Sequence, residues 1–517
     1  MHKIEVTTSA IIINDYNIGD CIKLENFFKI YEPVTHTYYY LGIYYDEKNR
    51  KLYLPRGIDI WFVENQVGVK AHIPKDTFTP FKKFKDITIK YLPRDDKQKE
   101  ALRFMLSKQE YKYTDTFTQL SVNLQTGKGK TYITVASLAY LGIRSIVITE
   151  SINWLRQWKN CIQEYTNISS KEIYNIEMSN GIHKLFNMSK QQLSNYKVFL
   201  VTHDTIQSFA TNNGWGKIGE LFEYLEIGIK VYDEAHLNFK NIYMIDFYTN
   251  IFKTYYLTAT PAKSSEKENR IYQMYFKNVP SIDLFDENND PHTEYIAFQF
   301  NSNPTPAQIS DCKNAYGLDR NKYTNYVVQQ EEFYKLLRVI LDVCLKATKN
   351  PGEKFLMYIG TNASIEVVKT WIIENYPELM NNIGVYTSVV SIEEKQSALN
   401  KRLILSTTKS AGAAVDIKGL KVTVVLAEPF KSEVIAIQTL GRTRDENTFY
   451  IDVVDRGFKY CQKYYYYKLP IFEKYATQCS IIKFTEKELE AKSQRIIEAR
   501  NPVMISTPNI QSAFGYI

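Results

Sequence analysis

The glycine-rich stretch Leu124–Thr131 constrains the fold of this chain more than any other. Its sequence is Leu-Gln-Thr-Gly-Lys-Gly-Lys-Thr. Apolar residues alternate over 120–124, which predicts a strand, and the pattern over 131–141 predicts a helix. Gly127 and Gly129 let the backbone curl so that successive N–H groups point inward, next to the positive end of the helix dipole. The sequence therefore predicts an anion-binding loop between a strand and a helix.

The side chains of this loop suit a nucleotide and its metal ion. Lys130 can reach the outer phosphates, and the Thr131 hydroxyl has the right length to hold Mg²⁺. The alternative is a solvated loop, and the strand before it and the helix after it argue against that alternative. We expect the phosphates to lie against the rest of the loop, namely Thr126, Gly127, Lys128 and Gly129.

Four further strands are predicted after the loop, at 145–149, 197–202, 227–232 and 254–257. The segments between them are longer and mostly helical. This βαβ rhythm predicts a parallel sheet that binds its ligands at the carboxyl ends of the strands. We therefore look for the chemistry in the residues that directly follow each strand.

Two adjacent carboxylates follow the third of these strands, in the sequence Asp-Glu-Ala-His at 233–236. Asp233 suits the Mg²⁺ shell, and Glu234 suits a base that orients and deprotonates the attacking water. His236 can report the nucleotide state to the rest of the domain. The next strand ends in Leu-Thr-Ala-Thr-Pro at 257–261, whose hydroxyls can carry hydrogen bonds away from the γ-phosphate. Each stretch alone also fits a polar loop after a buried strand.

Gln98 lies upstream of the glycine-rich loop, with roughly one strand between them. A planar amide at that position can offer an adenine edge both a donor and an acceptor. Surface helices contain many glutamines, so the position by itself also fits a solvated residue.

The glycine-rich loop, the Asp-Glu-Ala-His stretch and the Leu-Thr-Ala-Thr-Pro stretch, in this order and spacing, resemble the first motor domain of a superfamily 2 DExH helicase or translocase. The resemblance implies ATP as the nucleotide. It also implies two strand-contacting motifs, Ia at Ser151 with Gln157-Trp158, and Ib at Thr202. Glu150 stands where motif Ia usually has a proline.

A second βαβ series has no phosphate loop, so we expect it to complete the first domain's nucleotide site across a cleft. The resemblance extends to this series. Motif IV implies nucleic-acid contacts by Thr361 and Asn362, and motif V implies a strand contact by Thr408 and a nucleotide contact by Asp416, with Ala414 in place of the commonest glycine. The predicted strands are 294–300, 354–358, 383–386, 402–407, 422–426 and 448–454.

The stretch at 438–444 resembles motif VI and implies catalytic roles for Gln438, Arg442 and Arg444. An arginine from the opposite domain can neutralise charge on the transferred phosphate, and it makes hydrolysis depend on domain closure. The second arginine comes one residue earlier than in the family's pattern, and Asp445 occupies its usual place. Arg442 is therefore the better candidate for this role, and Arg444 can instead set the geometry of the cleft.

The predicted fold class is α/β, with two tandem RecA-like parallel-sheet domains behind a small N-terminal α+β or β-rich accessory domain. We expect the accessory domain over 1–90 and the motor domains over 91–290 and 291–457. A C-terminal helical extension is expected over 458–517.

The accessory domain offers two segments for nucleic-acid binding. Strands at 37–45 and 51–54 flank the polar turn 46–50, which predicts a tyrosine-rich hairpin. The segment at 81–85, Phe-Lys-Lys-Phe-Lys, can clamp a nucleic-acid backbone by charge and stacking, or it can be an amphipathic linker strand with its lysines in water. Such a hairpin before a DExH motor resembles the phage UvsW helicase group, which implies remodelling of forks and recombination intermediates.

Composition permits this function without demanding it. The chain has 517 residues, is 44% hydrophobic and 23% charged, and carries a net charge of +7, which allows a polyanionic partner. The six cysteines show neither metal-ligand nor disulfide spacing, and we find no segment apolar enough to span a membrane. We expect a cytoplasmic protein without a membrane partner, located in the host cytoplasm if the chain is viral.

The sequence as a whole predicts an ATP-dependent nucleic-acid helicase or translocase that acts on DNA through the sugar-phosphate backbone. Other replication or recombination proteins are further expected partners. Three alternatives stay open: an RNA helicase, the motor subunit of a larger restriction-type or remodelling complex, and a binding module that uses nucleotide only as a clamp. The adjacent carboxylates at 233 and 234 argue against the clamp.

Overall fold

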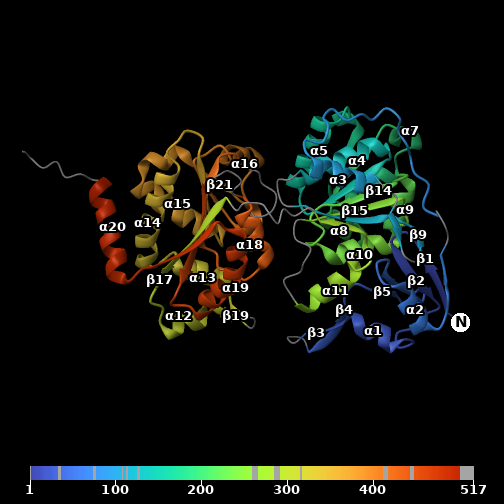
Figure 1. Ribbon diagram of the computed structural model, residues 1–517, viewed down its shortest axis with the longest axis horizontal. Helices are drawn as coiled ribbons and strands as arrows, with labels where there is room; N and C mark the ends of the chain where they lie inside the picture. The colour runs from blue at the N-terminus through green and yellow to red at the C-terminus, as the bar shows by residue number, and fades with distance from the viewer. Residues whose placement is uncertain are drawn as a thin grey trace, which may run out of the picture. The chain divides into compact units, whose positions relative to one another are not determined.

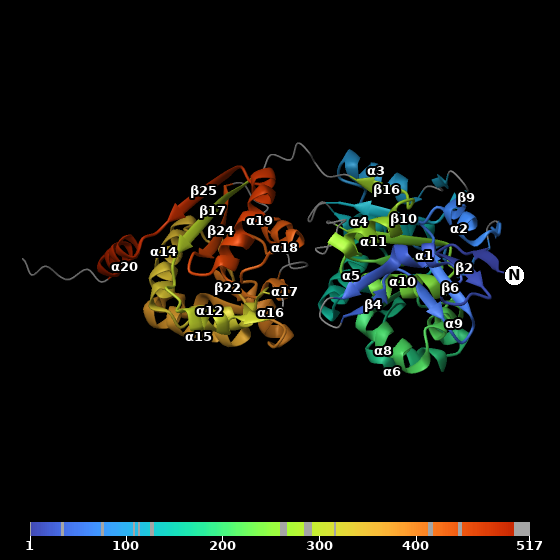
Figure 2. The same ribbon diagram turned by 90° about the horizontal axis from the view of Figure 1, so that it is seen from below.

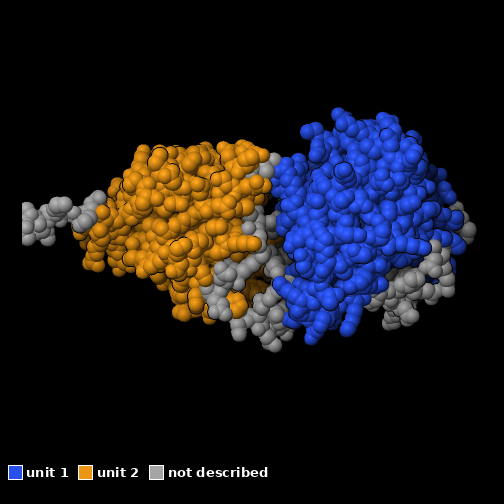
Figure 3. Space-filling model, turned by 90° about the horizontal axis from the view of Figure 1, so that it is seen from above, with its two compact units in different colours: residues 1–287 blue, residues 288–517 orange. Residues whose placement is uncertain are grey.

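The Val-, Ile- and Leu-rich runs of the chain form two large parallel sheets, one in each half of the chain (Figure 1). The chain divides into two units, residues 1–287 and 288–517 (Figure 3). Each unit has hydrophobic clusters of its own. The computed structural model describes residues 2–32, 36–73, 77–106, 109–111, 114–124, 129–258, 266–283, 292–314, 317–411, 417–442 and 447–500.

The first unit contains a seven-stranded sheet of order β12-β13-β11-β14-β15-β10-β16, and all its neighbouring strands are parallel. The five strands predicted for this sheet are confirmed. β12 and β16 at the two edges were not predicted, because three residues carry too little hydrophobic pattern. The bounds are β10 (Gln119–Asn123), β11 (Ser145–Thr149), β12 (Ile173–Asn175), β13 (Val198–Thr202), β14 (Ile229–Tyr232), β15 (Lys253–Thr258) and β16 (Ser281–Asp283).

Helices cover both faces of this sheet (Figure 1). One face packs on α3, α4 and α5 through strand residues such as Val147, and the other packs on α8, α9 and α10 through residues such as Ile146 and Ile148. This alternation follows from the two-residue period of a strand. The helices are α3 (Asp96–Leu106), α4 (Lys130–Leu141), α5 (Ile152–Tyr165), α6 (Met178–Phe186), α7 (Lys190–Leu193), α8 (His203–Asn213), α9 (Gly216–Tyr224), α10 (Phe239–Tyr248) and α11 (Glu266–Phe276).

The N-terminal region forms a mixed sheet of order β5-β6-β2-β1-β7. Its apolar side chains share one hydrophobic cluster with α10 and α11, and β2 and β6 lie beside α10 (Figure 2). The N-terminal region and the first motor domain therefore share a core. The elements are β1 (Lys3–Val6), β2 (Ala10–Asn14), α1 (Ile22–Phe28), β3 (Lys29–Glu32), β4 (Thr37–Tyr40), β5 (Tyr44–Asp46), β6 (Lys51–Pro55), α2 (Ile60–Val67) and β7 (Ala71–His72), followed by the short pair β8 (Gln109–Tyr111) and β9 (Thr114–Phe117).

The predicted tyrosine-rich hairpin is confirmed only in its second half. β5 and β6 pair antiparallel around the predicted turn. The single strand predicted over 37–45 is wrong, because residues 37–40 form β4, which pairs with β3. The chain bends at Gly42, whose φ is +79°. A Cβ at Gly42 would lie 2.9 Å from the side chain of Ile271, so glycine permits a close approach to α11.

The aromatic and cationic segment at 81–85 lies near the amino ends of the motor strands. The Lys82 N–H donates to the Glu226 carbonyl over 3.1 Å, just before β14 begins. The ring of Phe81 packs on Phe252, with 5.3 Å between the ring centroids, and the three lysines are exposed. These contacts favour the amphipathic linker strand over the nucleic-acid clamp, because Phe81 is committed to packing on the motor domain.

The second unit contains another seven-stranded parallel sheet, of order β21-β22-β20-β23-β24-β17-β25. The six strands predicted for it are confirmed. β25 extends the sheet beyond β17, so the C-terminal extension is not helical throughout. The bounds are β17 (Thr293–Phe300), β20 (Lys354–Ile359), β21 (Ile383–Tyr386), β22 (Leu403–Ser406), β23 (Leu420–Ala427), β24 (Thr448–Asp455) and β25 (Gln478–Lys483). The two-residue strands β18 (Lys313–Asn314) and β19 (Gly317–Leu318) form a separate antiparallel pair.

Helices also cover both faces of the second sheet, α14 and α15 on one face and α18 and α19 on the other. The two sheets confirm the predicted fold class, whereas the domain boundaries at 90, 290 and 457 stay predictions. Among the described helices, none combines the length and the apolar character that a membrane span requires. The helices of this unit are α12 (Pro306–Asp311), α13 (Arg320–Val327), α14 (Glu331–Ala347), α15 (Asn362–Asn375), α16 (Ile392–Ala398), α17 (Thr408–Ala411), α18 (Glu433–Leu440), α19 (Lys459–Tyr475) and α20 (Glu486–Arg500).

Candidate functional site

The glycine-rich loop joins β10 to α4, as the sequence predicts. Its residues Thr126, Gly127 and Lys128 lie outside the described part of the chain. Gly129 has a φ of +93° and stands immediately before α4. This backbone conformation favours glycine, and a Cβ there would also lie 2.5 Å from Nε2 of Gln98, so a larger residue would displace that side chain.

Gln98 lies in α3 and is 4% exposed. The side-chain Oε1 of Gln98 accepts from the Arg94 backbone N–H over 3.1 Å, and the backbone N–H of Gln98 donates to Oδ1 of Asp95 over 2.8 Å. The side-chain amide is therefore held against Gly129 at the start of α4. The structure brings Gln98 to the phosphate loop, and its contact with adenine stays a prediction.

Lys130 and Glu234 form an ion pair at the carboxyl edge of the sheet. Nζ of Lys130 lies 2.8 Å from Oε1 of Glu234, and both side chains are 10% exposed. Glu234 has a φ of +50°, a left-handed conformation that costs energy for a residue with a side chain. Neighbouring strands fix this turn, because the Asp233 N–H donates to the Ile148 carbonyl and the Ala235 N–H donates to the Leu257 carbonyl.

Asp233 is half-buried and accepts a hydrogen bond from Trp158, with Nε1 2.8 Å from Oδ2. Burial and the adjacent Glu234 raise the pKa of Asp233 above its usual range, while Lys130 and the Trp158 bond oppose that rise. Trp158 is only 1% exposed. Its indole therefore points to the carboxylate of Asp233 and does not lie on the surface where a strand-contacting motif would need it.

The donor set suits Mg²⁺ bound together with a nucleotide. Asp233 supplies a carboxylate, and Thr131, the second residue of α4, supplies a hydroxyl. Within the described residues, no group of three or more His, Cys, Asp or Glu side chains is placed to hold a metal ion by itself. Mg²⁺ is commonly held by one or two carboxylates together with phosphates and waters, so this sparse set fits it.

His236 connects the carboxylate pair to the end of β15. Its Nδ1 lies 3.0 Å from Oγ1 of Thr258 and 3.4 Å from Oε2 of Glu234. His236 is 3% exposed and Thr258 is 1% exposed, so this link is shielded from water. The rest of the Leu-Thr-Ala-Thr-Pro stretch, residues 259–261, lies outside the described residues.

The predicted nucleic-acid contacts of the first unit stand at helix N-termini that follow parallel strands. Ser151 immediately precedes α5, and Thr202 immediately precedes α8. The Thr202 side chain accepts from the Thr205 N–H over 3.2 Å, and Thr202 is 6% exposed. Its hydroxyl therefore caps α8, whereas Ser151 makes no such side-chain cap.

The predicted contacts of the second unit have the same placement. Thr361 accepts from the Ser364 N–H over 3.1 Å and caps α15, whose first residue, Asn362, is exposed. Thr408 begins α17 and is 7% exposed. Its N–H and its hydroxyl both donate to the carboxylate of Glu428, over 2.8 and 2.6 Å. Glu428 was not predicted, and an acid directly after the apolar run of β23 is the one sequence signal that could have found it.

Arg442 follows α18 and is 4% exposed. Burial raises the pKa of Tyr358 and Tyr386 above their usual value, and the positive charge of Arg442 opposes that rise. Gln438, within α18, is 8% exposed. Arg444 and Asp416 lie outside the described residues.

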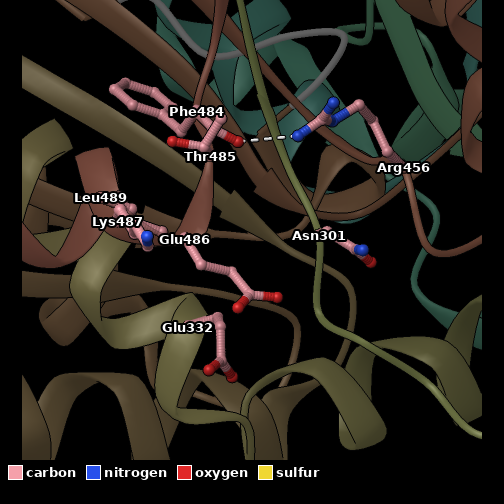
Figure 4. A pocket seen from close by; sticks show the side chains of 8 residues that line it. All are labelled: Asn301, Glu332, Arg456, Phe484, Thr485, Glu486, Lys487 and Leu489. Atoms are coloured by element: carbon pink, nitrogen blue, oxygen red, sulfur yellow. Dashed lines mark hydrogen bonds between the residues drawn. The ribbon is translucent and has the colours of Figure 1, made fainter.

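A cavity of about 410 Å³ lies at the carboxyl ends of β17, β24 and β25 in the second unit (Figure 4). The guanidinium of Arg456 donates to the Phe484 carbonyl over 2.7 Å at its wall. Acidic and basic side chains both line it, including Glu332, Glu486 and Lys487. None of the residues predicted from the sequence belongs to this cavity.

Comparison with known proteins finds one family model that matches part of the chain and several solved structures with a similar fold. Residues 92–263 match the family described as type III restriction enzyme, res subunit. No curated protein sequence matches the chain. The fold resembles that of a variant of Dbp5 from S. cerevisiae, solved with RNA and ADP BeF3, with a TM-score of 0.50, 14% identity and coverage of 77% of this chain and 93% of that one.

Two further solved structures are also similar. Mss116p, solved with single-stranded RNA and AMP-PNP, has a TM-score of 0.51 at 10% identity and covers 77% of this chain and 76% of its own. T4 UvsW has a TM-score of 0.35 at 14% identity, with coverage of 93% of this chain and 99% of its own. At these identities Dbp5 and Mss116p show a shared fold, whereas the TM-score of UvsW is too low to support an assignment to the phage group.

Proposed function

The chain has the fold of superfamily 2 helicases and carries a res-subunit domain over residues 92–263, and from this premise we propose that it hydrolyses ATP to move along nucleic acid. The observation that carries the proposal is the arrangement at the carboxyl edge of the first sheet. There Lys130 pairs with Glu234, and Asp233 stands beside them. The DExH subtype and the phage group stay predictions.

We propose that Lys130 changes partners when nucleotide binds. The phosphates compete with Glu234 for the ammonium group, and Glu234 is then released to accept a proton from the attacking water. Asp233 and Thr131 would hold Mg²⁺, which when bound neutralises charge on the phosphates. His236 and Thr258 would pass the change at Glu234 to the end of β15, through the contacts described above.

We propose for Arg442 the role that the family resemblance implies, neutralisation of charge on the transferred phosphate. Its burial keeps the guanidinium in a setting of low dielectric, where a charge acts more strongly than in water. Arg444 is the competing candidate. Arg442→Ala and Arg444→Ala, compared in ATPase assays at saturating ATP, would separate them, because loss of the neutralising arginine lowers kcat by about a thousandfold or more.

The proposed substrate is DNA, contacted through its sugar-phosphate backbone at the helix N-termini beside Ser151, Thr202, Thr361 and Thr408. The test is to measure ATPase rates side by side with single-stranded DNA, duplex DNA, forked DNA and RNA. We expect stimulation by DNA, strongest with forked DNA, and a steep loss of affinity as salt rises. Stimulation by RNA alone would instead identify an RNA helicase, and absence of turnover with all four would contradict the proposal.

The match to the res-subunit family favours a second candidate, the motor subunit of a larger restriction-type complex. The two candidates differ in what activates hydrolysis. A self-sufficient motor is stimulated by nucleic acid alone, whereas a subunit of a larger complex needs a partner protein. Full stimulation of the purified chain by DNA would exclude the second candidate.

A further inference from the structure

We infer that Trp158 is a positioning residue that holds the carboxylate of Asp233 in the orientation in which it binds the metal ion. The inference deepens the proposed function and rests on it, because the metal is the Mg²⁺ of the nucleotide site. It assigns Trp158 a role different from the strand contact that the sequence resemblance implies.

The first observation is the hydrogen bond itself. Nε1 of Trp158 donates to Oδ2 of Asp233 over 2.8 Å, and Trp158 is 1% exposed. An indole has one donor and no acceptor, and a buried one needs a partner for its N–H. A carboxylate is a strong partner because the bond is assisted by charge. The two residues therefore satisfy each other across the space between α5 and β14.

The second observation is how this bond fixes the orientation of the carboxylate. The torsion that rotates the carboxylate of an aspartate is soft, so the backbone alone does not fix where its oxygens point. The backbone of Asp233 is already fixed by its N–H donating to the Ile148 carbonyl over 3.0 Å. With Oδ2 held by Trp158, the orientation of the other oxygen, Oδ1, is also set. A metal ligand held in this way binds without first being ordered.

The third observation is how firmly Trp158 itself is held. The buried face of α5 consists of Leu155, Trp158 and Ile162, which pack in the cluster between this helix and the sheet. α5 begins directly after Ser151, and Trp158 stands two turns further on, about 10 Å along the axis. The same packed helix thus carries both Trp158, which holds Asp233, and the predicted nucleic-acid contact at Ser151.

A purely structural role for Trp158 makes a different prediction. If the ring only fills the core, any side chain of the same shape will serve, because packing depends on volume and not on the N–H. If Trp158 positions Asp233, the indole N–H is essential, and a side chain of the same volume that lacks this donor cannot replace Trp158. An isosteric side chain without the donor separates the two roles.

The test replaces Trp158 by 3-benzothienylalanine, which keeps the shape and lacks the N–H, and compares it with Trp158→Phe. The primary measurement is Mn²⁺ affinity of the full-length protein–ADP complex, by electron paramagnetic resonance, with ADP affinity in EDTA as the second. We expect Mn²⁺ affinity to fall about tenfold in both variants, the lower end of what loss of a ligand's supporting bond costs. Affinity for metal-free ADP should not change.

The matched control is Trp154→Phe, a half-buried tryptophan of the same helix that does not carry the bond to Asp233. It should bind Mn²⁺ as the wild type does. If the benzothienylalanine protein binds Mn²⁺ with the same affinity as the wild type, the inference is overturned, whether or not Trp158→Phe folds. If the wild-type protein binds ADP but its ADP complex does not bind Mn²⁺, the inference is overturned, and if it binds neither ADP nor Mn²⁺, the proposed function itself fails, which is a distinguishable result.

Discussion

Lys130 and Glu234 form an ion pair in the structure, with 2.8 Å between Nζ and Oε1, although the proposed hydrolysis requires both side chains to act on other groups. We therefore expect different defects from their loss. Lys130→Ala should abolish turnover, since the phosphates lose their cation. Glu234→Gln should bind ATP but lower kcat at least about a hundredfold, since an amide cannot take a proton from water. ATPase rates and calorimetric binding of ATP measure the two effects.

Lys99→Ala is the control for this pair, because Lys99 is an exposed lysine of the neighbouring α3 whose side chain is 50% accessible. It should leave both readouts at the wild-type level. Hydrolysis by Glu234→Gln at the wild-type rate would show that Glu234 is not the base.

His203 provides a pH-dependent prediction. It is 2% exposed, it stacks on Tyr232, and burial lowers its pKa to about 3. In the unfolded chain the His203 imidazole takes up a proton near pH 6.5, whereas in the folded chain it stays neutral. The free energy of unfolding therefore falls as the pH drops below 6.5. Between pH 7 and pH 5 the loss should be about 2 kcal/mol. Urea unfolding at the two pH values measures it.

His203→Phe is the matched variant, because it keeps a ring against Tyr232 and removes the titration. It should lose about 2 kcal/mol less stability than the wild type over the same pH interval. Equal losses in the two proteins would mean that His203 is protonated in the folded state.

At the scale of elements, Gly57 permits a close contact between the N-terminal sheet and α11. A Cβ at Gly57, in the turn after β6, would lie 2.1 Å from the backbone carbonyl oxygen of Tyr275. Gly57→Ala must push the sheet away from the helix, so we expect a loss of about 1–3 kcal/mol in the free energy of unfolding. Urea unfolding and limited proteolysis of the N-terminal region measure the effect.

Gly216→Ala is the comparison for this variant, since nothing lies within 4 Å of a Cβ at the first residue of α9. Its stability should change by no more than about 0.5 kcal/mol. Equal stabilities of the two alanine variants would mean that the docking between Gly57 and α11 is loose.

The elements that could be predicted are those whose pattern lies within one stretch of sequence. The central strands of both sheets are apolar runs, and hydrophobic periodicity locates them to within about two residues. The edge strands β12 and β16 have three residues each, too few for a period. The break at Gly42 could not be foreseen, because its reason is the approach of Ile271 from a distant helix.

The residues of the candidate site also differ in whether the sequence alone could locate them. Lys130, Asp233 and Glu234 belong to short stretches with a local pattern, so the sequence locates them. The bond from Trp158 to Asp233 joins residues 75 positions apart, and Glu428 holds Thr408 from 20 positions away. Such side-chain bonds leave no local pattern, and they appear only when the strands are placed side by side.

At the scale of the whole molecule, we expect the chain to divide into independently folding parts after residue 287 and not after residue 76. Each of the two units has its own buried clusters, so 1–287 and 288–517 should each unfold cooperatively when expressed alone. A protein starting at residue 77 loses the strands that cover α10 and α11. That loss exposes apolar side chains which are buried in the intact chain, namely Phe239, Tyr243, Met244, Phe247, Ile271 and Tyr272.

An exposed apolar face of this kind promotes association, so we expect residues 77–517 to aggregate on size-exclusion chromatography, whereas 1–287 elutes as a monomer. The comparison controls for expression, because both fragments contain the same first motor sheet. Thermal unfolding measured by circular dichroism provides the second readout. A monomeric 77–517 fragment with the unfolding temperature of the full chain would show that the N-terminal sheet is an appendage, and that the first motor domain completes its core without it.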